Sequence, residues 1–278
     1  MSITMEGLSG LFRVEMQVFN RFTSMKVEFL PSTVGTPAAK QFGISALVDD
    51  TIAIDAGTIG LLWPIDRQMK IKHVFLSHSH LDHVASLPLF LDNIYKPGPD
   101  CPSVYACDAS AKCLREDIFN DRLWPDFLRL SEEESPFLKL HTLKQEVPVR
   151  LPGLTVTPVP LKHVVPTMGF ILQDSVSAIA IVSDTGPSER IWELLAAIEN
   201  LRAVILDCSF PNSHRWLADK SGHLCPELFE KEIHDLPDSV RIIAYHLKPC
   251  FFDEIARELK LIPRANLEIG VPGREYNF

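Results

Sequence analysis

Short apolar runs of strand length recur along the chain, and stretches with apolar residues three or four positions apart follow several of them. The short runs are typical of buried strands, and the wider spacing is typical of amphipathic helices. We predict strands at 25–30, 44–48, 51–55, 71–77, 103–106, 154–159, 168–172, 178–183, 203–207 and 241–245. We predict helices at 85–95, 109–119, 191–198, 226–234 and 251–259. Two strand-rich halves, each followed by helices, predict an α/β sandwich with the helices outside.

Histidine and aspartate side chains come just after several of these predicted strands. The run from His78 to His83 follows one strand, and His163, Asp184 and His246 each follow another. Because strand ends on one side of a sheet converge in space, we expect these groups to meet in the fold despite their separation in sequence.

The densest of these groups is His78-Ser79-His80-Leu81-Asp82-His83. Alternate residues of an extended segment point the same way, so His78 and His80 can hold one metal ion from the same side. Asp82 and His83 lie at the start of the next helix, where they could hold a second ion. The alternative is a set of solvated loop histidines with a helix-capping aspartate. Three imidazoles and a carboxylate directly after a buried strand favour the metal site.

The ligand chemistry narrows the choice of metal. Imidazole and carboxylate together suit zinc, manganese or iron, and the run contains no cysteine, which argues against a closed structural zinc site. We therefore expect two divalent ions, zinc first, with manganese or iron as alternatives.

Two further features are open to more than one interpretation. Asp55 ends a predicted strand and could orient a metal-bound imidazole through its second nitrogen, or it could form a turn before Gly57. The segment 119–137 carries Trp124, Phe127 and Phe137. These aromatic side chains could cover a substrate base, but we favour simple packing.

Composition changes this picture little. The chain has 278 residues, 46% of them hydrophobic and 23% charged, as in an ordinary globular protein. The net charge of −9 argues weakly against a long nucleic-acid footprint. Six cysteines without a CxxC pair indicate a reducing compartment. We expect no signal peptide, and the sequence has no 18-residue apolar run. We expect a cytoplasmic protein that does not enter membranes, with an N-terminal extension at 1–25 and one domain at 26–278.

The whole pattern resembles the metallo-β-lactamase superfamily, whose fold is an αββα sandwich with a dimetal site between the sheets. The resemblance runs from about Met25 onward. It implies that the first metal is held by His78, His80 and His163, that the second is held by Asp82, His83 and His246, and that Asp184 bridges both.

A narrower resemblance is to the class II cyclic-nucleotide phosphodiesterases. It is carried by Asp207-Cys208-Ser209-Phe210-Pro211-Asn212, by Ser221-Gly222-His223-Leu224-Cys225-Pro226-Glu227, and by the form of the metal motif. The chain departs from the usual pattern in having Ser86 in place of a common Gly and Asp207 in place of a common Glu. Neither departure removes an implied metal ligand.

These resemblances imply a metal-dependent phosphodiesterase acting on a small nucleotide, with 3',5'-cyclic AMP or GMP as first candidates. Asp184, Asp82 and His223 are the expected catalytic residues: a metal-bridging hydroxide beside Asp184 attacks phosphorus, and His223 protonates the leaving oxygen. Asp207 is expected to orient His223 or His246.

Other functions stay open at this point. One is a tRNA 3'-processing endoribonuclease-like nuclease, which the acidic balance and the missing tRNA-gripping arm disfavour. Another is a non-catalytic di-iron sensor, which would need no leaving-group acid. We expect a small nucleotide as the partner rather than extended nucleic acid, and a homodimer is compatible with the superfamily.

Overall fold

The structure is a computed structural model that describes residues 24–32, 40–131 and 134–278. In these ranges the strands form two seven-stranded sheets. The first runs, in spatial order, β14 (Glu275–Asn277), β1 (Lys26–Phe29), β2 (Ala46–Val48), β3 (Ile52–Ile54), β4 (His73–Phe75), β5 (Ser103–Ala106) and β6 (Lys139–Thr142). The second runs β13 (Leu267–Ile269), β12 (Arg241–Tyr245), β11 (Leu201–Asp207), β10 (Ala178–Val182), β9 (Thr167–Gln173), β8 (Leu154–Leu161) and β7 (Val149–Leu151).

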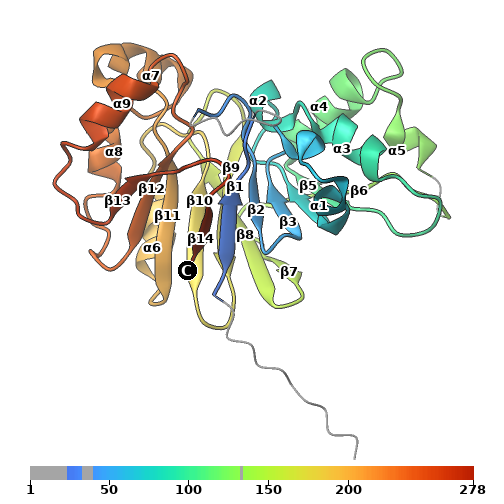
Figure 1. Cartoon of the computed structure of the whole chain (residues 1–278), viewed down its shortest axis with the longest axis horizontal. Coiled ribbons are helices and arrows are strands. Elements are labelled where there is room, and N and C mark those ends of the chain that lie inside the picture. The colour runs from blue at the N-terminus through green and yellow to red at the C-terminus, as the bar shows by residue number, and fades with distance from the viewer. Residues whose placement is uncertain (1–23, 33–39, 132–133) are drawn as a thin grey trace, which may run out of the picture.

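The helices lie on the outer faces of the two sheets, as Figure 1 shows. The first sheet carries α1 (Ile65–Lys70), α2 (Leu81–Val84), α3 (Leu87–Ile94), α4 (Asp108–Cys113) and α5 (Phe127–Leu130), with a short 3₁₀ helix at Ile59–Leu61 and a π-helical segment at Leu114–Ile118 that continues α4. The second carries α6 (Arg190–Ala196), α7 (Arg215–Ser221), α8 (Pro226–Glu232) and α9 (Phe252–Leu259), with a short turn at Asn212–His214.

Three buried apolar clusters define the layers. One lies between the sheets, where Phe75 of β4 meets Phe170 of β9 edge to face at 5.7 Å between ring centroids. A second lies between the first sheet and its helices, and a third between the second sheet and its helices. The predicted αββα sandwich is therefore confirmed.

Strand direction brings the polar strand ends to one edge of the sandwich. In the first sheet β3 and β4 are parallel, and in the second β10, β11 and β12 are parallel. β8 and β10 are both antiparallel to β9 and thus point the same way. The residues that follow these strands consequently gather at their carboxyl ends, where α2 and α7 also lie (Figure 1).

The predicted elements are found, with shorter bounds in places. The strand predicted at 71–77 is shorter in the structure, where β4 spans His73–Phe75 and the Leu76 amide still donates to the Tyr105 carbonyl at 2.8 Å. The helix predicted at 85–95 is preceded by a separate turn of helix, α2, which carries the end of the histidine motif. Asp49 and Asp50 have φ angles of 48° and 58° and make a tight turn between the antiparallel strands β2 and β3 without a glycine. The N-terminal extension predicted at 1–25 lies almost entirely outside the described residues.

The aromatic side chains of Phe127 and Phe137 pack against each other, in agreement with the favoured interpretation. Phe127 is 3% exposed and stacks on Phe137 at 4.2 Å between ring centroids, inside the cluster between the first sheet and its helices. All six cysteines are free thiols. Among the helices in the described ranges, none is long and apolar enough to cross a membrane.

Candidate metal centre

The histidine motif is held in place by backbone contacts to the neighbouring strand ends. The Asp82 carbonyl accepts from the Ile44 amide at 2.7 Å, and the His83 carbonyl accepts from the Ala56 amide at 2.6 Å. Gly57 allows this approach, since a Cβ atom there would lie 2.0 Å from the Asp82 carbonyl oxygen. The loop is thus clamped to the ends of β2 and β3.

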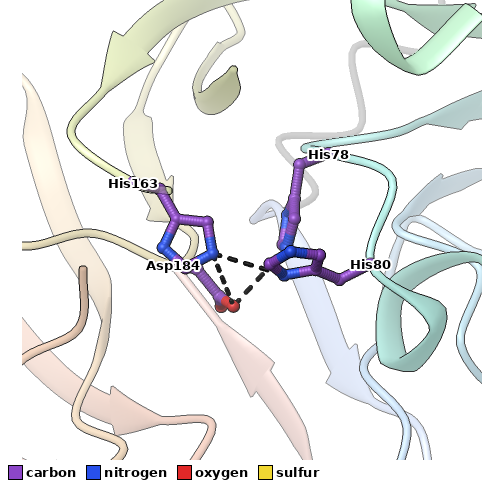
Figure 2. Close-up of side chains that lie close together, drawn as sticks. All are labelled: His78, His80, His163 and Asp184. Atoms are coloured by element: carbon purple, nitrogen blue, oxygen red, sulfur yellow. Dashed lines mark hydrogen bonds and ion pairs between the residues drawn. The ribbon is translucent and has the colours of Figure 1, made fainter. Parts of the chain in front are cut away.

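One group of ligand atoms comes from His78, His80, His163 and Asp184, shown in Figure 2. Their nitrogen and oxygen atoms lie within 4.8 Å of one another. His80 Nδ1 is 3.3 Å from His163 Nε2, and His78 Nε2 is 3.6 Å from Asp184 Oδ2. Three imidazoles and one carboxylate that converge in this way are a donor set for a divalent transition metal.

A second group comes from Asp82, His83 and His246. Asp82 Oδ2 lies 3.2 Å from His246 Nε2 and 4.0 Å from His83 Nε2. Asp184 lies between the two groups: its Oδ2 atom is 3.4 Å from His83 Nε2, and its Oδ1 atom is 3.2 Å from His246 Nδ1. A third, overlapping group comes from Asp184, Asp207, His223 and His246. The structure therefore brings the seven side chains that the sequence singled out close together, with His223 and Asp207 beside them.

Three buried polar atoms in this cluster have no hydrogen-bond partner: His78 Nε2, His83 Nε2 and Asp184 Oδ1. Buried polar atoms are almost always paired, because an unpaired one keeps its desolvation cost without compensation. Each of these atoms points into the cluster, where a cation would satisfy it. The residues present fit a metal centre.

The second nitrogens of four histidines are each held by a neighbour. His83 Nδ1 donates to Asp55 at 2.7 Å, His163 Nδ1 donates to the Gly222 carbonyl at 2.8 Å, and His78 Nδ1 lies 3.0 Å from the Ser77 hydroxyl. The Ser209 hydroxyl lies 2.9 Å from His246 Nδ1. These contacts direct the Nε2 atoms inward, which is how proteins orient histidine ligands.

Charge within the cluster shifts several pKa values in the metal-free protein. Burial lowers the pKa of His78 to about 2, helped by His83. Burial also opposes the protonation of His246, but the carboxylates of Asp184, Asp207 and Asp82 outweigh it and raise its pKa to about 9. The same balance raises the pKa of His83 and lowers that of Asp184, which is buried but surrounded by imidazoles.

Asp55 and Asp207 are two buried carboxylates that each hold a histidine of the cluster. Asp55 accepts from the Ser77 amide at 2.7 Å and the Ser77 hydroxyl at 2.8 Å, in addition to His83. Asp207 accepts from the Ser209 hydroxyl at 2.6 Å and from His223 Nδ1 at 3.0 Å. His223, which is 5% exposed, places its Nε2 atom 3.8 Å from Asp184 Oδ2.

Three side chains to which the sequence analysis gave no role contribute to this cluster. Ser77 and Ser209 tie the supporting carboxylates to the histidines, and the Lys248 ammonium lies 3.3 Å from Asp82 Oδ2. Each stands within two positions of a named residue, and that proximity is the one signal that could have identified them.

The chain is similar to a known domain family and to several known proteins. Residues 52–246 match the Beta-lactamase superfamily domain. The chain is 26% identical over 247 residues to a probable 3',5'-cyclic-nucleotide phosphodiesterase of Yersinia pestis, covering 78% of this chain and 67% of that protein. It is 34% identical over 191 residues to a 3',5'-cyclic-nucleotide phosphodiesterase of Aliivibrio fischeri, covering 61% of this chain and 54% of that protein. The match therefore spans about half the length of the Aliivibrio relative.

The fold is also found among solved structures. Unliganded yeast PDE1 superposes with a TM-score of 0.75 at 17% identity, covering 92% of this chain and 100% of that one. Since the matched domain spans most of the sandwich and contains the strands that carry the metal-type residues, the chain belongs to the β-lactamase superfamily.

Proposed function

We propose that this protein is a dimetal phosphodiesterase that hydrolyses a small nucleotide phosphodiester, with 3',5'-cyclic AMP or GMP as the first candidates. The observation that carries the proposal is the meeting of two ligand groups at Asp184, beside a histidine that is held by a second buried carboxylate. The similarity to proteins named cyclic-nucleotide phosphodiesterases supports the choice of substrate.

In this proposal His78, His80 and His163 hold one ion and Asp82, His83 and His246 hold the other, with Asp184 shared. Two divalent ions there would act as Lewis acids on a phosphoryl oxygen and lower the pKa of a bound water. Zinc is our first choice, and manganese or iron would suit the same donors.

His223 is the proposed general acid. Its Nδ1 atom donates to Asp207, so its Nε2 atom faces Asp184 and the centre of the cluster. An alkoxide that leaves phosphorus needs a proton at neutral pH, and a buried histidine fixed by a carboxylate can deliver one from Nε2. The hydrogen bond to Asp207 keeps the imidazole ring of His223 in this orientation.

The direct test is product analysis with the zinc- and manganese-loaded protein. We expect cyclic AMP or cyclic GMP to be converted to a nucleoside monophosphate, with the activity lost in Asp184→Ala. Cleavage of bis(p-nitrophenyl) phosphate without cleavage of either cyclic nucleotide would support phosphodiesterase chemistry. It would indicate that the natural substrate is another nucleotide or RNA. Failure to cleave any phosphodiester would refute the proposal.

A further inference from the structure

Lys248 is a positive charge at the exposed side of the metal cluster. Its ammonium lies 3.3 Å from Asp82 Oδ2, and its side chain is 31% exposed. Within the described residues, no other lysine or arginine nitrogen lies within 4 Å of the four carboxylates of the cluster, those of Asp55, Asp82, Asp184 and Asp207.

The backbone holds this lysine beside the ligands independently of its side chain. Lys248 follows His246 by two residues, in the loop between β12 and α9. Its amide donates to the Ser209 carbonyl at 3.3 Å, and its carbonyl accepts from the Phe251 amide at 2.9 Å. The charge is therefore presented to the centre by a fixed loop, and removing the side-chain charge leaves these bonds in place.

The pairing with Asp82 leaves the ammonium available to a second anion. Asp82 Oδ2 is shared between Lys248 and His246 Nε2, and it also belongs to the second group of candidate metal ligands. A carboxylate that coordinates a metal ion binds a neighbouring ammonium group less strongly. The four negative charges of the cluster's aspartates would neutralise two divalent ions. The positive charge of Lys248 would then have no counter-charge in the cluster and could bind a further anion.

We propose that Lys248 binds a charged phosphoryl oxygen of the substrate, so that the site selects anionic phosphodiesters over uncharged esters, thioesters and lactams. This inference rests on the proposed function and adds to it a preference for negatively charged substrates. A lysine is suited to this task, because its ammonium is a compact charge on a flexible stem that can follow a phosphate oxygen.

The test compares Lys248→Met and Lys248→Arg with a matched control, Lys26→Met. Lys26 is a lysine of similar exposure that also pairs with an aspartate, Asp50 at 2.8 Å, at the amino end of β1 and away from the cluster. Isothermal titration measures the binding of inorganic phosphate and of adenosine 5'-monophosphate to each zinc-loaded full-length protein, and elemental analysis measures its zinc content.

We expect Lys248→Met to weaken binding of both probes by roughly tenfold, corresponding to about 1.4 kcal/mol. Lys248→Arg should restore most of that affinity, and Lys26→Met should leave it unchanged. In kinetics, Lys248→Met should raise KM for bis(p-nitrophenyl) phosphate by a similar factor with little change in kcat.

Equal affinities in wild type and Lys248→Met would overturn the inference. A loss of affinity that merely follows a loss of bound zinc would overturn it too, since Lys248 would then only position Asp82. If the wild type binds phosphate through Lys248 but cleaves no phosphodiester, the proposed function fails while the anion site stands.

Discussion

His223 illustrates that side chains of the same type can have different proposed roles within the cluster. It is buried and hydrogen-bonded to Asp207. It lies outside the two ligand sets proposed above, although its ring also lies within 4.8 Å of ligand atoms of Asp184, Asp207 and His246. A histidine that served only structure would have no reason to direct a nitrogen toward Asp184. Its proposed task is to give a proton, and that task depends on how basic the leaving oxygen is.

We therefore predict that His223→Ala lowers kcat for a cyclic nucleotide by about 10²–10⁴-fold, the usual contribution of a positioned acid. The loss should be much smaller for bis(p-nitrophenyl) phosphate, because nitrophenolate leaves without protonation. Steady-state kinetics on both substrates at equal metal content checks this. A loss of the same size on both substrates would show that His223 acts on the metals or on the fold instead.

At the scale of elements, the position of the ligands depends on a close contact between the end of β3 and the turn of helix α2. Gly57 receives the Asp82 carbonyl where a Cβ atom would stand only 2.0 Å away, and its amide donates to the Ile44 carbonyl at 2.9 Å. The atoms that a side chain would meet are backbone atoms, which cannot rotate away. Helix α2 would have to move, together with Asp82 and His83.

Gly57→Ala should accordingly reduce metal content and cost roughly 1–3 kcal/mol of unfolding free energy, as overpacking of a tight site does. Urea denaturation and elemental analysis measure the two effects. Gly153→Ala is the control: Gly153 has a φ of +78° but no atom within 4 Å of its Cβ position, so backbone strain should appear there without loss of metal. Full metal content in Gly57→Ala would show that the clamp is dispensable.

The elements themselves differ in how well a sequence can predict them. β10 is a continuous apolar run buried on both faces, and β12 is one after its first residue, Arg241; both were predicted closely. β14 has one buried residue in three, and β7 has none fully buried, so neither leaves an apolar signature. These short strands form because the backbone of a neighbouring strand forms hydrogen bonds with them. Their own residues therefore do not predict them.

The same limit explains what could be predicted of the cluster. Histidines and aspartates at strand ends are visible in the sequence because their chemistry is specific. Ser77, Ser209 and Lys248 are residue types that occur anywhere on a protein. Their roles arise from contacts such as Lys248 to Asp82, which joins residues 166 positions apart. Only the topology of the whole sandwich brings such pairs together.

For the whole molecule, the candidate metal centre lies where the two sheets meet. His78, His80 and His83 come from the first sheet, while His163, Asp184 and His246 come from the second. Without a cation, buried nitrogen and oxygen atoms at this junction lack partners, and the imidazole rings of His83 and His163 lie 4.2 and 5.0 Å from that of His78 between ring centroids. A metal that binds only when both sheets are in place must stabilise the folded state against unfolding.

We predict that chelation lowers the melting temperature and that zinc restores it. At free zinc 100-fold above Kd, each site contributes about 2.7 kcal/mol, so the melting temperature should differ by roughly 5–20 °C between the two forms. Differential scanning calorimetry with EDTA and with zinc measures this difference. Asp184→Ala, which removes the carboxylate shared by both groups, should show a much smaller response, whereas Lys26→Met should respond like the wild type. Equal melting temperatures with and without zinc in the wild type would mean that the cluster does not bind metal in the folded protein, and the proposed phosphodiesterase chemistry would lose its basis.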